Sequence, residues 1–241
     1  MKAGQYQLMR QVEDEHWWYR VLRGQVERSL SRMVPKGRSL LDAGCGTGGM
    51  LSLLNAWQTH GCDIAPEAVE HCRARRLERV LVSSVHALPY ADESFEAVLS
   101  LDVLYHAQVD EHLVLSEMRR VLKRGGVLIL NVPAFDCLRG AHDAAVDGVR
   151  RYRLRSLKRL LRTHGFEIVE AHYWNAWLFL PLLLHRWLSQ SAGGDLVMPP
   201  RWLNALLAAG GKLDAALCRH TRLPFGTSLH VVARSHGTIK E

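Results

Sequence analysis

The chain has 241 residues, of which 48% are hydrophobic and 23% are charged. This length suits one α/β domain with a full core plus extensions, and the composition excludes a disordered or low-complexity protein. The formal net charge of +7 is unevenly spread, because the range 150–162 holds seven basic residues and no acidic one. Such a segment is a solvated helix face or a surface that meets phosphate.

The cysteines exclude several classes of site. All five are scattered and none forms a Cys-x-x-Cys pair, which argues against a disulfide framework or a metal knuckle.

The first residues lack the apolar core of a signal peptide, and the longest apolar run, Ala176–Leu184, is about half of a membrane span. We therefore expect a cytoplasmic protein that needs no metal. Peripheral contact with the inner face of a membrane stays open.

Short apolar runs alternate with amphipathic ones over the range 39–170, which is typical of βα units and a parallel sheet. Strands are predicted at Ser39–Ala43, Gln58–Asp63, Val80–Ser83, Ala97–Ser100 and Val127–Val132, followed by Phe166–Glu170 and Ser228–Arg234. Helices are predicted at Gly49–Asn55, Pro66–Arg75, Glu111–Leu122 and Leu154–Thr163. About 55 residues rich in Trp, Leu and Pro separate the last two strands, too many for a simple connection.

A glycine loop follows the first strand. Gly44, Gly46, Gly48 and Gly49 let the backbone pass close to a ligand at the start of a helix. The same glycines match the dinucleotide fingerprint, with Asp63 near the distance expected for a residue that binds ribose hydroxyls. Glycine spacing alone therefore does not distinguish NAD from S-adenosylmethionine.

Asp42 favours S-adenosylmethionine. A carboxylate ahead of the first glycine would repel dinucleotide phosphates, but it suits a ligand with an ammonium group and no phosphate. The run Leu40–Gly49 resembles the first motif of the class I S-adenosylmethionine-dependent methyltransferases, especially the small-molecule, type 11-like branch. The resemblance covers about residues 13 to 170 and includes Ser83–Glu96, Leu101–His106 and Met118–Gly126, in the family's order.

This resemblance implies an α/β, Rossmann-like, seven-stranded and mostly parallel sheet, with helices on both faces and an antiparallel last strand. We divide the chain into an N-terminal helical cap (1–37), the methyltransferase core (38–175 and 227–235) and an apolar helical insertion (176–226). The insertion is expected to act as lid, acceptor pocket or interface.

The resemblance also assigns cofactor contacts. The loop would hold the methionine part, Asp63 both ribose hydroxyls and Ile64 the adenine. Many members carry Asp where this chain has Ser84, so the adenine contact falls to the Ser84 hydroxyl or to the Val85 backbone. The predicted cofactor-binding residues are Asp42, Ala43, Gly44, Cys45, Gly46, Gly48, Asp63, Ile64, Ser84, Val85, Leu101, Trp18, Tyr19 and Arg20.

Methyl transfer from a sulfonium requires alignment of the acceptor, exclusion of water and, for some acceptors, removal of a proton. His106, after the fourth strand, and His142 and Asp143, after the fifth, would lie at the carboxyl edge of the sheet, where ligands bind. These are the predicted catalytic residues. For each of them a structural role is at least as common.

The acceptor stays open at this point. The leading hypothesis is a small, apolar or lipid-like molecule, with the insertion supplying its pocket. The aromatic and apolar segment Tyr173–Trp187 also suits a membrane surface or a homodimer interface. The alternatives are an RNA methyltransferase that uses the Arg150–Arg162 face and a protein that binds S-adenosylmethionine without catalysis. No separate RNA-binding module is recognisable, so nucleic acid is not the expected partner.

Overall fold

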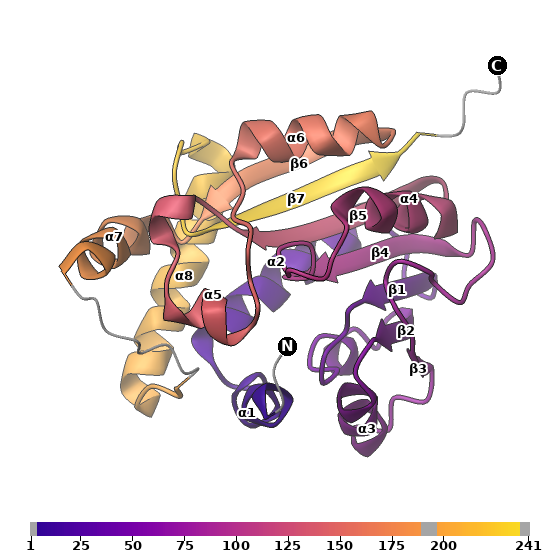
Figure 1. The fold of residues 1–241 in the computed structure, drawn as a ribbon, viewed down its shortest axis with the longest axis horizontal. Helices are drawn as coiled ribbons and strands as arrows, with labels where there is room; N and C mark the ends of the chain where they lie inside the picture. The colour runs from indigo at the N-terminus through magenta and orange to yellow at the C-terminus, as the bar shows by residue number, and fades with distance from the viewer. Residues whose placement is uncertain (1–3, 189–196, 237–241) are drawn as a thin grey trace.

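Seven strands form one sheet in a computed structural model that describes residues 4–188 and 197–236, apart from the side chain of His142 (Figure 1). The strand order is β3-β2-β1-β4-β5-β7-β6. β7 is antiparallel to both of its neighbours, and the other pairs are parallel. The predicted Rossmann-like fold is therefore confirmed. The strands are β1 (Ser39–Ala43), β2 (Gln58–Asp63), β3 (Val80–Val82), β4 (Phe95–Leu101), β5 (Leu122–Pro133), β6 (Phe166–Trp174) and β7 (Ser228–Ser235).

Helices cover both faces of the sheet (Figure 1). Leu40 and Leu41 of β1 are both fully buried, and because successive side chains alternate along a strand, they enter opposite layers. One layer contains α2 and α8, and the other contains α4 and α6. The helices are α1 (Gln5–Val12), α2 (Trp17–Met33), α3 (Pro66–Ala74), α4 (Glu111–Val121), α5 (Ala141–Ala145), α6 (Leu154–Thr163), α7 (Phe179–Leu188) and α8 (Arg201–Thr221).

Several predicted elements differ from the structure. β5 begins at Leu122 instead of Val127, and β4 begins at Phe95 instead of Ala97. The helix expected at Gly49–Asn55 is wrong, because only the 3-10 turn η1 (Leu51–Leu53) forms there. The chain reverses direction soon after this turn to enter β2. The Trp57 indole donates a hydrogen bond to the Val34 carbonyl and stabilises the reversal. β6 extends to Trp174 instead of ending at Glu170, because it pairs with β7 along its whole length. Two further 3-10 turns, η2 (Asp136–Leu138) and η3 (Ala176–Leu178), follow β5 and β6.

No helix in the described parts of the chain is long and apolar enough to cross a bilayer.

A buried histidine pair joins the sheet to α2. His172 of β6 and His230 of β7 are register partners, with ring centroids 5.5 Å apart. Each Nε2 has a partner on α2: Gln25 Oε1 for His172 and Ser29 Oγ for His230, both at 3.2 Å. Both Nδ1 atoms are buried without a hydrogen-bond partner. Burial lowers the pKa of both imidazoles, and the neighbouring cation Arg219 adds to this effect. Glu170, 3.5 Å from His172 Nδ1, opposes it at His172 only in part.

This pair predicts a loss of stability in acid. An imidazole whose pKa is lowered on folding binds fewer protons than the unfolded chain below pH about 6.5, so its stabilisation is complete above that pH and is lost as the pH falls. Between pH about 7.5 and about 5, wild-type protein should lose about 1–2 kcal/mol more than His230→Gln, as measured by urea unfolding. The comparison is differential because buried carboxyl groups with raised pKa values titrate with the opposite sign.

The exposed His220 supplies the control. His220→Gln should retain the wild-type pH dependence. An unchanged dependence in His230→Gln would show that the pair does not couple protonation to folding.

Candidate cofactor and acceptor site

The glycine loop leaves β1 at the carboxyl edge of the sheet. The amides of Gly44 and Cys45 both donate to the Cys62 carbonyl of β2, at 2.8 and 2.9 Å. Gly44 has φ of 90°, and a Cβ there would lie 2.4 Å from the Val103 side chain. Gly46 and Gly48 also have positive φ. Only glycine fits at Gly44, and the loop is a tight cradle of backbone groups.

Asp63 ends β2 beside this loop and is buried. Its Oδ2 accepts the Gly46 amide at 2.9 Å, and its Oδ1 accepts the Ala65 amide at 3.0 Å and the Tyr6 hydroxyl at 3.1 Å. The carboxylate is thus held by the backbone on one side and capped by α1 on the other. The contact of Asp63 with ribose hydroxyls stays a prediction.

Asp42 lies under the loop, 2% exposed, and its Oδ1 has no hydrogen-bond partner. Burial, together with the nearby carboxylates of Asp63 and Glu13, raises its pKa to about 7. An unpaired buried carboxyl group among other acids fits a cationic ligand group. The ammonium and sulfonium of S-adenosylmethionine match this donor set, whereas a dinucleotide phosphate does not.

Glu13, which sequence reasoning did not single out, ties the N-terminal segment to the loop. Its carboxylate accepts the Gly49 amide at 3.2 Å and the Thr47 hydroxyl, and it pairs at 2.6 Å with Arg75, the residue directly after α3. Met9 of α1 lies against Gly46. The acidic run at 13–15 was the available signal, but its partners are more than 30 residues away in the chain.

Asp42 predicts pH-dependent binding of the cofactor. Its deprotonated form attracts the ligand ammonium, so the Kd of S-adenosylhomocysteine should rise as the pH falls below about 7, by up to about tenfold per pH unit. Asp42→Asn should bind about tenfold more weakly at neutral pH and show a flat profile, as measured by calorimetry. A variant with the wild-type slope would assign the dependence to another group.

Tyr6 predicts competition between α1 and the cofactor. Because its hydroxyl occupies Asp63, Tyr6→Phe should lower the Kd of S-adenosylmethionine about threefold, the value of one modest hydrogen bond. The measurement is a calorimetric titration beside the wild type. A raised Kd would instead make the Tyr6 hydroxyl a contact of the bound cofactor.

The predicted adenine-side residues lie around the end of β2 and the segment after β3. Ile64 is 63% exposed, a large apolar side chain left open next to Asp63. Val85 is buried, and the Ser84 hydroxyl contacts the amide and Nδ1 of His86 at 3.2 and 3.0 Å. The contacts of these residues with adenine stay predictions.

The N-terminal aromatic residues have several roles in packing. Trp18 stacks on Trp174 at 5.7 Å, and Trp17 packs edge-on against Trp177. Tyr19 lies near the carboxylates of Glu13 and Asp102. Burial raises the pKa of its hydroxyl, and these two negative charges add to the effect. The remaining predicted contacts have diverse settings: Arg20 is exposed, Ala43 and Cys45 are buried, and Leu101 is half-buried at the end of β4.

Asp102 follows β4 and has φ of 54°, a conformation that non-glycine residues rarely adopt. Both carboxylate oxygens accept Asn131 Nδ2, at 3.1 and 3.0 Å, and Asn131 Oδ1 accepts the Trp174 indole at 2.9 Å. Burial raises the pKa of Asp102 to about 7, against the opposing effects of Asn131 and Arg151. Sequence reasoning placed Asp102 in a motif but gave it no role; its position directly after a central strand was the signal.

His106 is available as a base. Its Nδ1 lies 2.8 Å from the Val146 carbonyl, which can only accept, so this nitrogen carries the proton and Nε2 the lone pair. Burial lowers the pKa of the imidazole, which keeps it neutral near pH 7. Tyr105 stacks on the ring at 4.3 Å.

Asp143 is held in an ion pair. Its carboxylate receives two hydrogen bonds from Arg151, at 2.9 and 3.0 Å, and one from the Gly140 amide at 2.8 Å. The pair fastens the loop after β5. The predicted partner His142 lies in α5, but its side chain falls outside the described residues, so the pairing of His142 with Asp143 stays a prediction.

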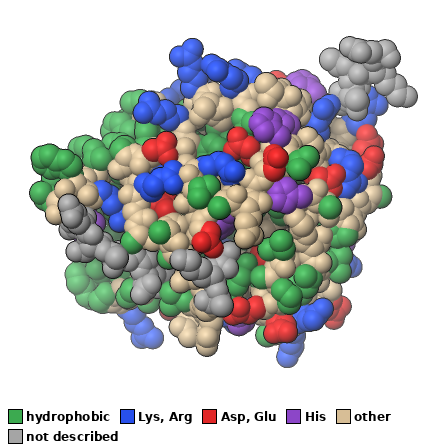
Figure 2. Space-filling view, in the orientation of Figure 1, with side chains coloured by type: hydrophobic (Ala, Val, Ile, Leu, Met, Phe, Trp, Pro, Cys, Tyr) green, Lys and Arg blue, Asp and Glu red, His purple; other side chains and the backbone are tan. Residues whose placement is uncertain are grey.

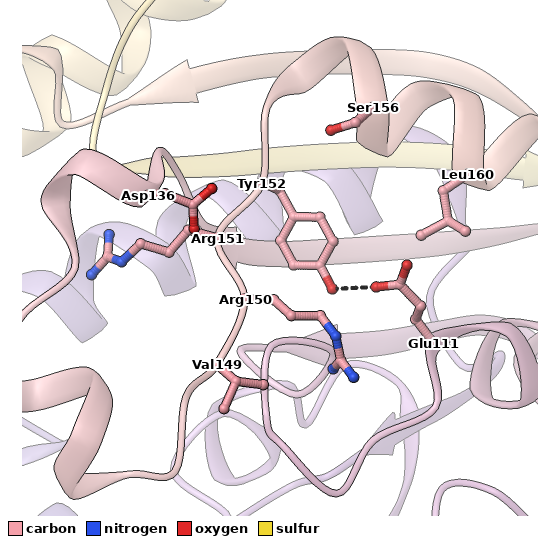
Figure 3. Close-up of a pocket in the computed structure, with 8 residues that line it drawn as sticks. All are labelled: Glu111, Asp136, Val149, Arg150, Arg151, Tyr152, Ser156 and Leu160. Atoms are coloured by element: carbon pink, nitrogen blue, oxygen red, sulfur yellow. Dashed lines mark hydrogen bonds between the residues drawn. The ribbon is translucent and has the colours of Figure 1, made fainter.

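A polar pocket adjoins this loop (Figure 3). The Tyr152 hydroxyl crosses it to Glu111 at 2.7 Å, and Arg150 donates to the carbonyls of Leu104 and His106. These hydrogen bonds hold the side chains of Tyr152 and Arg150 in place at the pocket. Across the described ranges, no group of three or more His, Cys, Asp or Glu side chains is arranged to hold a metal ion.

Comparison with known proteins agrees with this geometry. Residues 41–130 match the family described as methyltransferase domain. A human protein named probable tRNA methyltransferase 9B is 34% identical over 113 residues, which is 46% of this chain and 24% of the human protein. A Mycolicibacterium smegmatis protein named probable S-adenosylmethionine-dependent methyltransferase is 31% identical over 163 residues, covering 65% of this chain and 62% of that protein.

A solved structure from Thermotoga maritima, described as a possible histamine N-methyltransferase, superimposes with a TM-score of 0.62 at 18% identity and covers 96% of this chain and 95% of its own. The fold is that of the class I S-adenosylmethionine-dependent methyltransferases. The chain matches a methyltransferase domain over residues 41–130, which is less than half of its length. It spans only about a quarter of the human relative.

Proposed function

We propose that the chain transfers the methyl group of S-adenosylmethionine to a small acceptor with an apolar part, by in-line displacement at the methyl carbon. The observation that carries the proposal is the buried Asp42 beneath the glycine loop, beside which Asp63 lies. The Oδ1 atom of Asp42 has no hydrogen-bond partner. When bound, the cofactor supplies the electrophilic methyl group. The protein contributes orientation and exclusion of water.

Two groups near the ends of β4 can take a proton from the acceptor. Asp102 has a raised pKa near neutrality, which suits a general base that works at neutral pH, and burial favours neutral His106, whose Nδ1 carries the proton. Asp143 is already paired with Arg151, so it suits a role in positioning the loop after β5 better than a role as a base. The choice between Asp102 and His106 depends on the acidity of the acceptor.

Aromatic side chains support an acceptor with an apolar part. Phe135, directly after β5, stacks on Tyr173 at 5.0 Å and meets Phe179 of α7 at 5.2 Å. Phe225 extends this aromatic cluster at 5.5 Å from Phe179. The cluster borders the acceptor edge of the sheet, where aromatic walls favour apolar ligands.

RNA is the second candidate, favoured by two observations. Relatives include proteins named as tRNA methyltransferases. The basic segment is only partly free: Arg150 and Arg151 bond within the protein, and Arg153 lies over the Phe135 ring. Four side chains on α6 form no ion pair with another described residue: Arg155, Lys158, Arg159 and Arg162.

The test is release of S-adenosylhomocysteine from S-adenosylmethionine with two acceptor sets, isoprenoid or aromatic small molecules and unmodified tRNA. We expect turnover with the first set and none with tRNA. Gly44→Ala should abolish both binding and turnover, because the new Cβ meets Val103.

Gly37→Ala is the matched control, since Gly37 also has positive φ but open space around it. It should lose some stability and keep binding. Turnover with tRNA that falls steeply with salt would favour the RNA candidate. Binding of S-adenosylmethionine without release on any acceptor would favour a protein that binds the cofactor without catalysis.

A further inference from the structure

α7 has an apolar face that nothing in the described structure covers. None of its residues is buried. Leu180, Leu184, Trp187 and Leu188 recur at helical spacing and are 66%, 56%, 84% and 70% exposed. This spacing places them on one side of the helix. A monomer in water rarely leaves such a face open without a partner.

α8 has a second exposed apolar stripe. Trp202, Leu206, Leu213 and Leu217 are each more than half exposed and lie on one side of a helix of 21 residues. The opposite side of α8 is packed on the protein through buried residues such as Ala208 and Ala215. The two helices lie at the same end of the molecule (Figure 1), where Figure 2 shows hydrophobic side chains gathered at the surface.

The charges on these helices have one sign at the surface. Arg186, Arg201, Lys212 and Arg219 are their Lys and Arg residues, and the single carboxylate, Asp214, is buried and accepts the Trp177 amide. Arg219 is only 14% exposed and pairs with Glu170 at 3.6 Å, so it adds little to the surface charge. Arg201 and Lys212 are exposed and pair with no other described residue. A second copy of this surface would bring cations against cations, whereas an anionic lipid surface supplies phosphates to them.

α7 also contacts the acceptor side of the protein. Arg186 packs on Gly140 in the loop that Asp143 fastens, and Phe179 belongs to the aromatic cluster beside Phe135. α7 therefore lies beside the edge where the acceptor would enter.

We propose that α7 and α8 together form a docking surface for an anionic lipid bilayer, with the apolar stripes inserted among the acyl chains and the flanking basic residues at the phosphates. Tryptophan at the rim and leucine below it suit the headgroup boundary. Docking would place the acceptor edge next to the lipid phase. The proposal concerns a surface away from the cofactor cradle, so it holds or fails independently of turnover.

The experiment is flotation of the full chain with vesicles made of equal parts phosphatidylcholine and phosphatidylglycerol, with pure phosphatidylcholine vesicles in parallel. Wild-type protein should bind the anionic vesicles, bind pure phosphatidylcholine at least about tenfold more weakly, and be released by high salt. Leu184→Asp should weaken the partition coefficient about tenfold or more. Leu113→Asp, on α4 at the same 56% exposure, should leave it unchanged.

The charges are tested with a second matched pair. Lys212→Gln should reduce binding to anionic vesicles about fivefold, and Lys36→Gln, also exposed, should not. Because these substitutions leave the apolar face intact, they decide the matter even if Leu184→Asp fails to fold by circular dichroism. Equal effects within either matched pair, or no wild-type binding to anionic vesicles, would overturn the proposal. So would a wild-type dimer in light scattering that Leu184→Asp dissociates without affecting vesicle binding.

Discussion

Burial of acidic side chains beneath the glycine loop is the constraint that organises this end of the molecule. Burial, together with the nearby carboxylates of Asp63 and Glu13, raises the pKa of Asp42 to about 7. Three compensations are built around them: backbone amides for Asp63, Arg75 for Glu13, and protonation for Asp42. The pocket thus has a negative potential that a ligand cation would neutralise, so part of the binding free energy is stored in the protein before the ligand arrives.

The parts of the fold that could be predicted from sequence depend on local pattern. β1 was predicted to the residue because it is a short apolar run ahead of the glycine loop, and α6 because its amphipathic period ends at Gly165. β2 was also predicted to the residue, although its sequence is mostly polar. The cradle glycines were recognisable because positive φ at this turn admits almost nothing else. Here local chemistry and global fold agree.

The parts that were missed depend on contacts between distant segments. Glu13 and Tyr6 acquire their roles from Gly49 and Asp63, which only the folded chain brings near. The helix expected after the glycine loop has a favourable local pattern, yet the reversal into β2 overrides it. Asp143 was predicted as a catalytic residue from its position in the sequence. Its ion pair with Arg151 depends on the conformation of the loop after β5, which the sequence pattern does not give. Pattern analysis detects periodicity but not partners.

The position of β7 has a consequence for how the chain matures. β7 lies between β5 and β6 in the sheet, although it follows both of them and the two apolar helices α7 and α8 in the chain. Until it emerges from the ribosome, β5 and β6 each present an unpaired edge beside exposed leucine and tryptophan. Such edges are the usual starting points of aggregation. The last strand in the chain therefore closes the open edges of β5 and β6 together.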